Sequence, residues 1–299
     1  MDLEWIASVT GAKRARQLER VQTLWSGYGE IVRVGLDGAP FASVVVKHVA
    51  PSPRPATDVS HARKLRSYAV ERTFYETFSR ECRTFRVPRF IAAEGAAMVL
   101  EDLDAAGFPG RRHAPRGAAL DACLRWLAAF HAAFMGRTPE GLWSEGTYWH
   151  LDTRRDELPA IVDPALRDAA AALDQKIVDC TYRTWVHGDA KAANFCFPAD
   201  ANDNVAALDF QYVGGGCGMR DVAYLVSGEP DEEKLVDRYF DHLRGVMGEA
   251  SAPVERAWRP LYRWACADFY RFLAGWSPSS YARDAHARAL VRDVLKELR

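Results

Sequence analysis

Two polar loops, each at the end of an apolar stretch, place the strongest constraint on what this chain can fold into. Each apolar stretch is typical of a short strand, so the aspartate of each loop, Asp189 or Asp209, is expected where a strand ends. An Asn and a carboxylate offer the hard oxygen ligands that Mg²⁺ prefers, and a second carboxylate near a hydroxyl can orient it or accept its proton. That equipment is typical of phosphoryl transfer, in which a protein mainly positions groups and neutralises charge. The loops are Trp185-Val186-His187-Gly188-Asp189-Ala190-Lys191-Ala192-Ala193-Asn194-Phe195 and Ala207-Leu208-Asp209-Phe210-Gln211.

The spacing H-x-D-x-x-x-x-N followed by D-F is that of kinase catalytic and metal loops. The chain has H-G-D where most protein kinases have H-R-D, a D-F-Q motif, and a G…D-V-A-Y-L segment at 218–225. In these features it resembles the aminoglycoside phosphotransferase and choline kinase superfamily, most of all its ecdysteroid-kinase-like members. The resemblance implies an α+β, two-lobed, protein-kinase-like fold. A small N-lobe with an antiparallel sheet, residues 1–102, would bind the nucleotide. A mainly helical C-lobe, residues 103–299, would hold the catalytic loop, the metal site and the acceptor pocket.

The resemblance also implies roles for the loop residues. Asp189 would orient the acceptor hydroxyl and accept its proton, while Asp209 and Asn194 would hold Mg²⁺. Taken alone, each Asp could be a turn or N-cap residue. Lys191 could stabilise charge on the transferred phosphoryl group, pair with Asp189 or point to solvent, and these readings stay open. Asp221 matches the structural Asp that ties down the catalytic loop in the family.

The first fifty residues predict a small-lobe sheet with a glycine turn. Gly27 and Gly29 lie in the first turn, where glycine lets backbone N–H groups approach phosphates, although G-x-G between strands can also be a plain hairpin. The context of a further strand pair with a lysine favours the phosphate reading. The strands are expected at 21–25, 30–36 and 41–49, after a charged helix or turn at 12–20.

Lys47 lies in an otherwise apolar strand, where a buried ammonium needs a counter-charge. A helix expected at 67–78 carries Glu71, and the family pattern selects Glu71 over Glu76 as the partner of Lys47. In the resemblance, Lys47 would hold the α and β phosphates of ATP, and the hinge backbone from Glu101 to Leu103 would meet the adenine edge.

The rest of the chain predicts connecting strands and a helical C-terminal part. His131 falls in the apolar stretch of a strong helix and reads as a core histidine. The segment 146–154 resembles a family segment but receives no function. The aromatic side chains crowded at 258–276 fit a core stripe, with one or two able to face a substrate. The expected loops are 50–66 and 105–117, the strands 86–93 and 96–103, and the helices 118–134, 158–182, 232–247, 253–274 and 280–298.

Composition excludes several classes of protein. With 39 Lys plus Arg against 40 Asp plus Glu, nothing in the charge predicts a nucleic-acid or membrane partner. No apolar run approaches the ~20 residues that span a bilayer. Six cysteines lack C-x-x-C spacing, which disfavours a zinc site or a disulfide framework. The first residues lack a signal-peptide pattern, so a cytoplasmic protein is expected.

The sequence thus predicts ATP- and Mg²⁺-dependent phosphorylation of a hydroxyl on a small-molecule acceptor. A catalytically silent nucleotide-binding regulator is the alternative, and a protein kinase is disfavoured because no A-P-E-like segment follows Asp209. The acceptor, the choice between ATP and GTP, and the oligomeric state stay open. The Trp-rich C-terminal region suits a steroid-like or aromatic alcohol better than a polycationic aminoglycoside.

Overall fold

The computed structural model describes residues 1–24, 27–50, 58–199 and 204–298 and divides into two compact units. The first contains Met1–His113 with Phe195–Gln211, and the second contains Ala114–Asn194 with Tyr212–Arg299. Residues 103–113 and 195–211 therefore cluster with the N-terminal part. The expected division of function between 1–102 and 103–299 stays a prediction.

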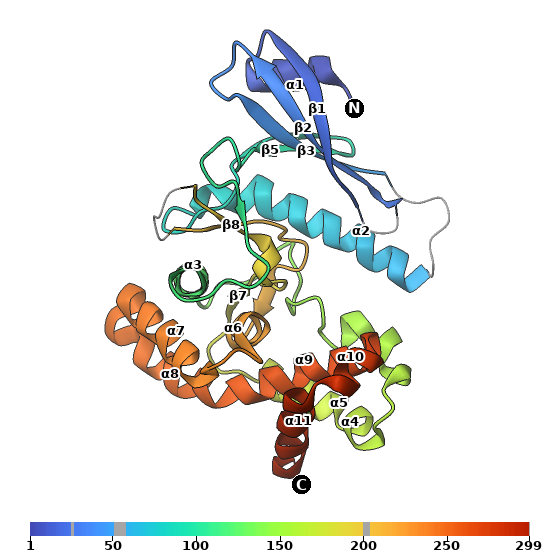
Figure 1. Ribbon diagram of the computed structural model, residues 1–299, viewed down its shortest axis with the longest axis vertical. Coiled ribbons are helices and arrows are strands. Elements are labelled where there is room, and N and C mark those ends of the chain that lie inside the picture. Colours follow the sequence, from blue (N-terminus) through green and yellow to red (C-terminus); the bar gives the residue numbers. More distant parts are fainter. Residues whose placement is uncertain (25–26, 51–57, 200–203, 299) are drawn as a thin grey trace. The chain divides into compact units, whose positions relative to one another are not determined.

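The first unit is built on a five-stranded antiparallel sheet in the order β1-β2-β3-β5-β4 (Figure 1). Its central strands are rich in β-branched residues, which pack well on a pleated surface. Alternate residues such as Val32, Val34, Val44 and Val46 are fully buried, and Ile6 of the first helix packs on them. The elements are α1 (Leu3–Thr10), β1 (Arg14–Thr23), β2 (Gly29–Asp37), β3 (Ser43–Val49), α2 (Asp58–Thr73), the single π-helical turn η2 (Phe74–Phe78), the short 3-10 turn η3 (Ser79–Glu81), β4 (Phe90–Glu94) and β5 (Ala97–Glu101).

A three-stranded sheet in the same unit places the D-F-Q motif. Its order is β6 (Gly110–Arg111), β8 (Phe195–Phe197) and β9 (Ala206–Ala207), and Asp209 follows two residues after β9. Leu103, Cys196 and Ala206 form a small buried cluster under it. The Phe210 ring stacks on Phe74 with 4.0 Å between the ring centroids, which fixes the motif against η2.

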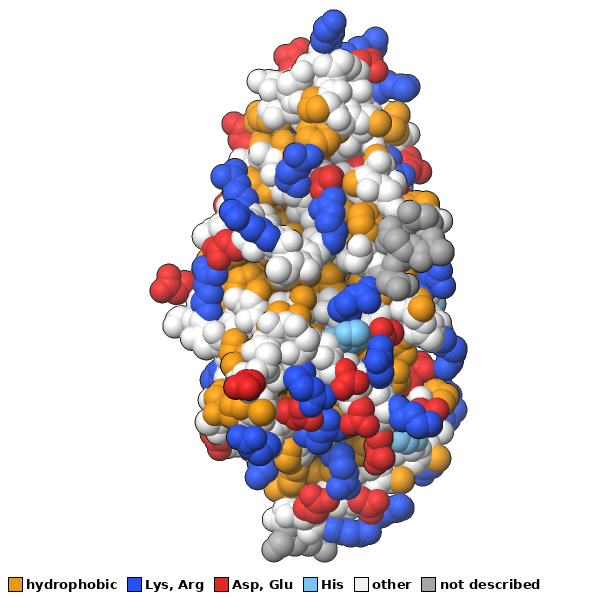
Figure 2. Space-filling view, turned by 90° about the vertical axis from the view of Figure 1, so that its left-hand side faces the viewer, with side chains coloured by type: hydrophobic (Ala, Val, Ile, Leu, Met, Phe, Trp, Pro, Cys, Tyr) orange, Lys and Arg blue, Asp and Glu red, His pale blue; other side chains and the backbone are white. Residues whose placement is uncertain are grey.

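The second unit is mainly helical, with one short antiparallel pair of strands, β10 with β7, that leads into the H-G-D loop. The helix α9 is largely buried and packs against α5, α6 and α11. In the lower half of the face drawn in Figure 2, basic and acidic side chains are interspersed. The elements are α3 (Ala118–Ala133), η4 (Asp152–Ala160), α4 (Pro164–Asp168), α5 (Ala170–Val178), β7 (Thr184–Val186), η5 (Ala192–Asn194), β10 (Gly214–Gly216), α6 (Met219–Val226), α7 (Glu232–Met247), η6 (Gly248–Ala250), α8 (Ser251–Trp258), η7 (Arg259–Leu261), α9 (Tyr262–Trp276), α10 (Pro278–Arg283) and α11 (Ala285–Glu297).

Two expectations for the N-terminal part are wrong. The helix or turn expected at 12–20 lies in β1, because this edge strand is exposed at nearly every position and shows no apolar alternation to reveal it. The loop expected at 50–66 ends at Asp58, where α2 begins. The prolines that suggested that loop, with Trp25 of the first expected strand, lie outside the described residues.

The remaining elements follow the sequence more closely. The helices expected at 118–134 and 232–247 are α3 and α7, while those expected at 253–274 and 280–298 are each divided in two. The loop expected at 105–117 contains the short strand β6. None of the described helices is long and apolar enough to cross a membrane.

Candidate functional site

The H-G-D loop is anchored from within the second unit by Asp221. This buried carboxylate accepts hydrogen bonds from the backbone N–H of His187 at 2.6 Å and of Gly188 at 2.9 Å. The His131 ring places Nε2 3.1 Å from the same carboxylate and Nδ1 2.7 Å from the Tyr239 hydroxyl. The structure thus confirms the core histidine and the loop-anchoring Asp that the sequence predicted.

Gly188 is packed between two other segments of main chain, at Tyr212 and at Thr147. Its φ is +80°, and a Cβ atom there would lie 2.1 Å from the Tyr212 carbonyl oxygen and 2.9 Å from the Thr147 nitrogen. Both neighbours are backbone atoms, which cannot turn aside as a flexible side chain would. This crowding explains why the loop reads H-G-D and not H-R-D.

Asp189 is nearly buried and contacts the two other polar residues of its loop. Lys191 Nζ lies 2.8 Å from Asp189 Oδ2, and Asn194 Nδ2 donates to the same oxygen at 2.9 Å and to the Asp189 carbonyl at 2.8 Å. Because the Asn194 amide nitrogen faces Asp189, Oδ1 of Asn194 is the atom able to ligate a cation. Three roles were open for Lys191: stabilising the phosphoryl group, pairing with Asp189 or pointing to solvent. In the structure Lys191 pairs with Asp189, and its side chain is 42% exposed.

Two tyrosines that the sequence did not single out lie against Asp189. The Tyr224 hydroxyl lies 3.3 Å from the Tyr148 hydroxyl and within hydrogen-bonding reach of the Asp189 carboxylate. Burial raises the pKa of Tyr148 to about 12, and burial with the Asp189 charge raises that of Tyr224 above its ordinary value. Both phenols therefore stay protonated near neutral pH. They come from segments 76 positions apart. The 146–154 pattern contains Tyr148 and the D-V-A-Y-L segment contains Tyr224, but neither pattern gave the tyrosine a role.

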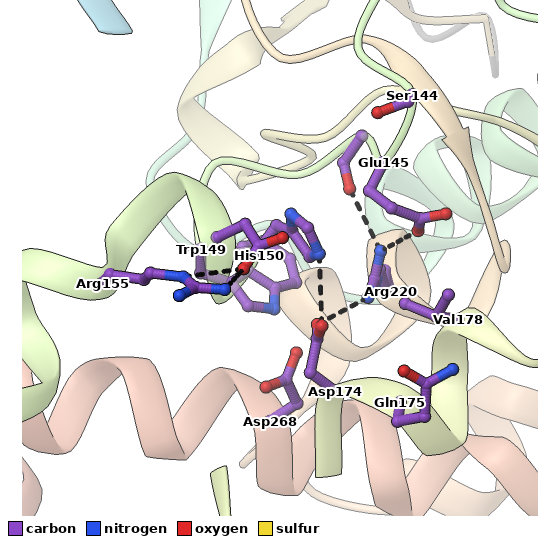
Figure 3. A network of polar contacts seen from close by, with 12 residues as sticks. Ser144, Glu145, Trp149, His150, Arg155, Asp174, Gln175, Val178, Arg220 and Asp268 are labelled. Carbon is purple, nitrogen blue, oxygen red and sulfur yellow. Dashed lines mark hydrogen bonds and ion pairs between the residues drawn. The ribbon is translucent and has the colours of Figure 1, made fainter. Parts of the chain in front are cut away.

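A buried ionic network fixes the segment that carries Tyr148 (Figure 3). Arg220 donates through Nη1 to Glu145 at 2.8 Å and through Nη2 to Asp174 at 3.1 Å, and His150 Nε2 lies 3.2 Å from the second Asp174 oxygen. Burial alone would raise the pKa of Asp174, but His150 and Arg220 lower it below its ordinary value. Removing one partner would leave an uncompensated buried charge, so each contact of the network is costly to break. The network therefore constrains the segment on both sides of Tyr148, at Glu145 and at His150.

A second group of predicted residues meets in the first unit. Lys47 Nζ lies 2.5 Å from Glu71 Oε2 and 3.9 Å from Asp209 Oδ1. Burial would lower the pKa of Lys47, but the two carboxylates raise it. Burial raises the pKa of Glu71 to about 7, against the opposing effect of Lys47. The predicted Lys47–Glu71 contact is therefore present.

Asp209 has the features of a cation ligand. It adopts φ +70°, which is uncommon for a residue other than glycine, and so turns its carboxylate out of the line of the strand. Its Oδ1 is buried and has no hydrogen-bond partner among the described residues. In the part of the chain that the structure describes, no three His, Cys, Asp or Glu side chains are grouped to hold a metal. Mg²⁺ needs no such cage, since it binds through one or two carboxylates plus phosphate oxygens.

The described part of the glycine turn lies between β1 and β2, and the segment expected to be the hinge begins at the last residue of β5. The turn between β1 and β2 is closed by hydrogen bonds from Leu24 N–H to Gly29 O at 2.8 Å and from Gly27 N–H to Leu24 O at 3.0 Å. A Cβ at Gly29 would lie 2.0 Å from the His48 carbonyl oxygen, so strand packing alone already requires that glycine. Its role towards phosphates stays a prediction.

At the hinge, Glu101 N–H donates to Arg89 O at 2.9 Å, and Leu103 O accepts from Phe108 N–H at 2.8 Å. These two groups are engaged within the unit. The contact of the hinge with adenine stays a prediction. The structure thus groups Lys47, Glu71 and Asp209 in one unit, and Asp189, Lys191 and Asn194 in the other.

Three solved structures with a similar fold are a macrolide phosphotransferase, a choline kinase and an aminoglycoside phosphotransferase. The macrolide 2'-phosphotransferase MphH of Brachybacterium faecium is 16% identical over 94% of this chain and 92% of its own, with a TM-score of 0.54. The choline kinase of Cryptosporidium parvum is 11% identical over 95% and 88%, with a TM-score of 0.56. APH(2'')-IIa, solved with streptomycin and ATP, is 14% identical over 98% and 94%, with a TM-score of 0.52. At these identities the likeness shows the fold, and it confirms the predicted α+β, protein-kinase-like class.

A comparison with curated protein sequences gives no match. The model of the phosphotransferase enzyme family matches residues 20–261, which is most of the chain. The chain belongs to that family, and the superfamily indicated by the H-G-D and D-F-Q motifs is confirmed. The finer likeness to ecdysteroid-kinase-like members stays a prediction.

Proposed function

We propose that the protein transfers the γ-phosphoryl group of ATP to a hydroxyl of a small-molecule acceptor, with Asp189 as the residue that orients the hydroxyl and accepts its proton. The observation that carries the proposal is the environment of Asp189. Its carboxylate is nearly buried and held by Asn194 and Lys191, on a loop anchored by Asp221. A carboxylate fixed in this way can align a hydroxyl for in-line attack.

The nucleotide would be held by the residues grouped in the first unit. Lys47, kept cationic and oriented by Glu71, is suited to the α and β phosphates. Asp209 and Asn194 are the residues assigned to Mg²⁺, which would neutralise charge on the phosphates. Lys191 is close enough to Asp189 to stabilise charge on the phosphoryl group that leaves ATP.

Asp189→Asn tests the proposal against the nucleotide-binding regulator. The amide is nearly isosteric but cannot accept the hydroxyl proton, so transfer should fall by about 10²- to 10⁴-fold while Mg·ATP binding is kept. Calorimetry would measure binding, and slow ATP hydrolysis to water would measure transfer when no acceptor is supplied.

The exposed Asp168→Asn is the matched control, since its side chain is 78% exposed. It should behave as the wild type in both assays. An unchanged hydrolysis rate in folded Asp189→Asn would remove Asp189 from the catalytic role. Mg·ATP binding without any transfer by the wild type would favour the regulator.

A further inference from the structure

We infer that the acceptor is a neutral alcohol with an apolar or aromatic face, bound against a wall formed by Tyr148, Tyr212, Tyr224 and Phe269, and is not a cationic amine. The inference rests on the proposed function of Asp189, because it assigns the substrate class of that site. It is carried by four features of the second unit: the packing of the wall, the charges beside it, the hydroxyl groups at its polar end and the rigidity of its support.

The wall is a continuous set of half-buried rings next to Asp189. The Tyr148 ring centroid lies 5.8 Å from that of Tyr212 and 5.6 Å from that of Tyr224, and Tyr224 lies 5.0 Å from Phe269. All four side chains are partly exposed, unlike Trp258, which belongs to the buried core. The rings are tilted to one another, with interplanar angles of 60°, 50° and 52°, and together offer an apolar surface whose burial against an apolar ligand face is favourable.

The charges beside the wall disfavour a cationic acceptor. Two carboxylates beside the wall already contact a basic side chain: Asp189 contacts Lys191, and Glu157 contacts Arg154, which lies over the Tyr148 ring. An ammonium group brought to this surface would share a carboxylate with a basic side chain that already contacts it, and the like charges would repel.

An aromatic wall can also attract a cation through its ring faces, but here the protein supplies that cation itself. The Arg154 guanidinium lies 5.3 Å from the Tyr148 ring centroid and 5.4 Å from that of Phe272, and its side chain is only 14% exposed. Arg154 also donates to the Tyr148 carbonyl at 2.9 Å, which holds it in place. Arg154 therefore already occupies a face of the Tyr148 ring that a cationic ligand would need.

The polar end of the wall fits a hydroxyl. The Tyr224 hydroxyl donates to the Tyr148 hydroxyl at 3.3 Å, and both phenols stay protonated for the reasons given above. They are therefore neutral hydrogen-bonding groups beside the carboxylate. An alcohol whose ring packs on Tyr148 and Tyr224 would present its hydroxyl to Asp189.

The wall is held in advance of binding. The network of Figure 3 fixes Glu145 and His150 on either side of Tyr148, Arg271 donates to the Trp149 carbonyl at 2.9 Å, and Tyr148 N–H donates to Gly188 O at 2.9 Å. Tyr148 is therefore tied both to the helical scaffold and to the catalytic loop. Rigid support of this kind lowers the ordering cost of binding and favours one acceptor shape.

The test compares three probes as acceptors with the full-length wild type and Mg·ATP: 2-phenylethanol, choline and kanamycin. Formation of the phosphate ester is followed by ³¹P NMR, and binding by ligand-observed NMR. We expect kcat/KM for 2-phenylethanol to exceed that for each cation at least tenfold. Tyr148→Ala and Tyr224→Ala should each weaken its binding at least fivefold. Tyr281→Ala, a half-buried tyrosine on α10, should leave it unchanged.

Each outcome decides between the two proposals. Better transfer to choline or kanamycin would overturn the neutral-alcohol inference and leave the proposed function standing. Binding of 2-phenylethanol that the Tyr148 and Tyr224 variants do not weaken would also overturn it, as would no binding at all. Loss of its binding in those two variants alone would support the wall even if transfer is slow. Absence of any Asp189-dependent ATP turnover would instead count against the proposed function.

Discussion

At the scale of single residues, the hypothesis of a metal site rests on the carboxylate of Asp209 in the D-F-Q motif. Asp209 combines a left-handed backbone with a buried, unbonded carboxylate oxygen 3.9 Å from Lys47 Nζ. Such a group is costly to maintain unless a cation or a phosphate-bound metal satisfies it.

Asp209→Ala should therefore abolish Mg²⁺-dependent ATP turnover, with a loss of at least about 10²-fold, while the protein stays folded. Calorimetric titration of ATP with and without Mg²⁺ should show that the metal no longer strengthens binding. Asp37→Ala, which removes an exposed carboxylate from the end of β2 in the same unit, serves as the control. Wild-type turnover in a folded Asp209→Ala protein would exclude the metal role.

At this scale the sequence was informative where a residue type was out of place. A lysine among the valines of β3 required a counter-charge, and Glu71 is in contact with it. Tyr148 and Tyr224 gave no such signal, because a tyrosine at the edge of an apolar segment is ordinary until its spatial neighbours are known. Their position beside Asp189 depends on the path of a loop that no residue pattern specifies.

At the scale of elements, the H-G-D loop depends on the first turn of α6. Asp221 accepts two backbone N–H groups of that loop, so the helix and the loop form one unit of structure. A carboxylate has only acceptor oxygens, whereas an amide has one acceptor oxygen and one donor nitrogen.

Asp221→Asn should release one end of the loop, because its amide nitrogen would face a backbone N–H. We expect a loss of about 1–3 kcal/mol in unfolding free energy, the cost of a buried unsatisfied donor. Amide hydrogen exchange in peptides covering 185–191 should quicken. The exposed Asp241→Asn on α7 should change neither measurement by a comparable amount. Unaltered exchange in Asp221→Asn would show that other contacts hold the loop.

Elements were predictable where the apolar period was clear and not where it was absent. The amphipathic helices α3 and α7 were expected with nearly the observed bounds. Residues 14–20 of the edge strand β1 were missed, because nearly all side chains of this strand are exposed and solvent exposure on both faces erased the period-2 signal; only its end, 21–23, was expected as a strand. The start of α2 was missed because the prolines before it favoured a longer loop.

At the scale of the whole molecule, stability should depend on pH through one buried side chain. Burial raises the pKa of Glu71 from 4.5 to about 7 in the folded protein. The folded state therefore holds this proton more tightly than the unfolded chain does. The resulting stabilisation is complete below about pH 4.5 and is lost as pH rises towards 7.

Glu71→Gln isolates this dependence. Between pH 4.5 and 7, the thermal midpoint of the wild type should fall relative to that of Glu71→Gln and then level off above 7. The corresponding free energy has an upper limit of about 3 kcal/mol, at ~1.4 kcal/mol per pKa unit. Glu76→Gln, a partly exposed neighbour paired with Arg72, should track the wild type. A wild-type midpoint that does not fall relative to that of Glu71→Gln between pH 4.5 and 7 would show that Lys47 keeps Glu71 ionised instead.

The crowding around Gly188 has an evolutionary consequence. The chain shares only 11% to 16% of its residues with three solved structures of the same fold, so most positions are open to drift. Position 188 accepts only glycine, because the Cβ atom of any other residue would clash with two separate stretches of main chain, at Tyr212 and Thr147. An arginine there requires both stretches of main chain to move apart. A change of this loop from H-G-D to H-R-D therefore needs compensating changes around Tyr212 and Thr147 and is not available to Gly188→Arg alone.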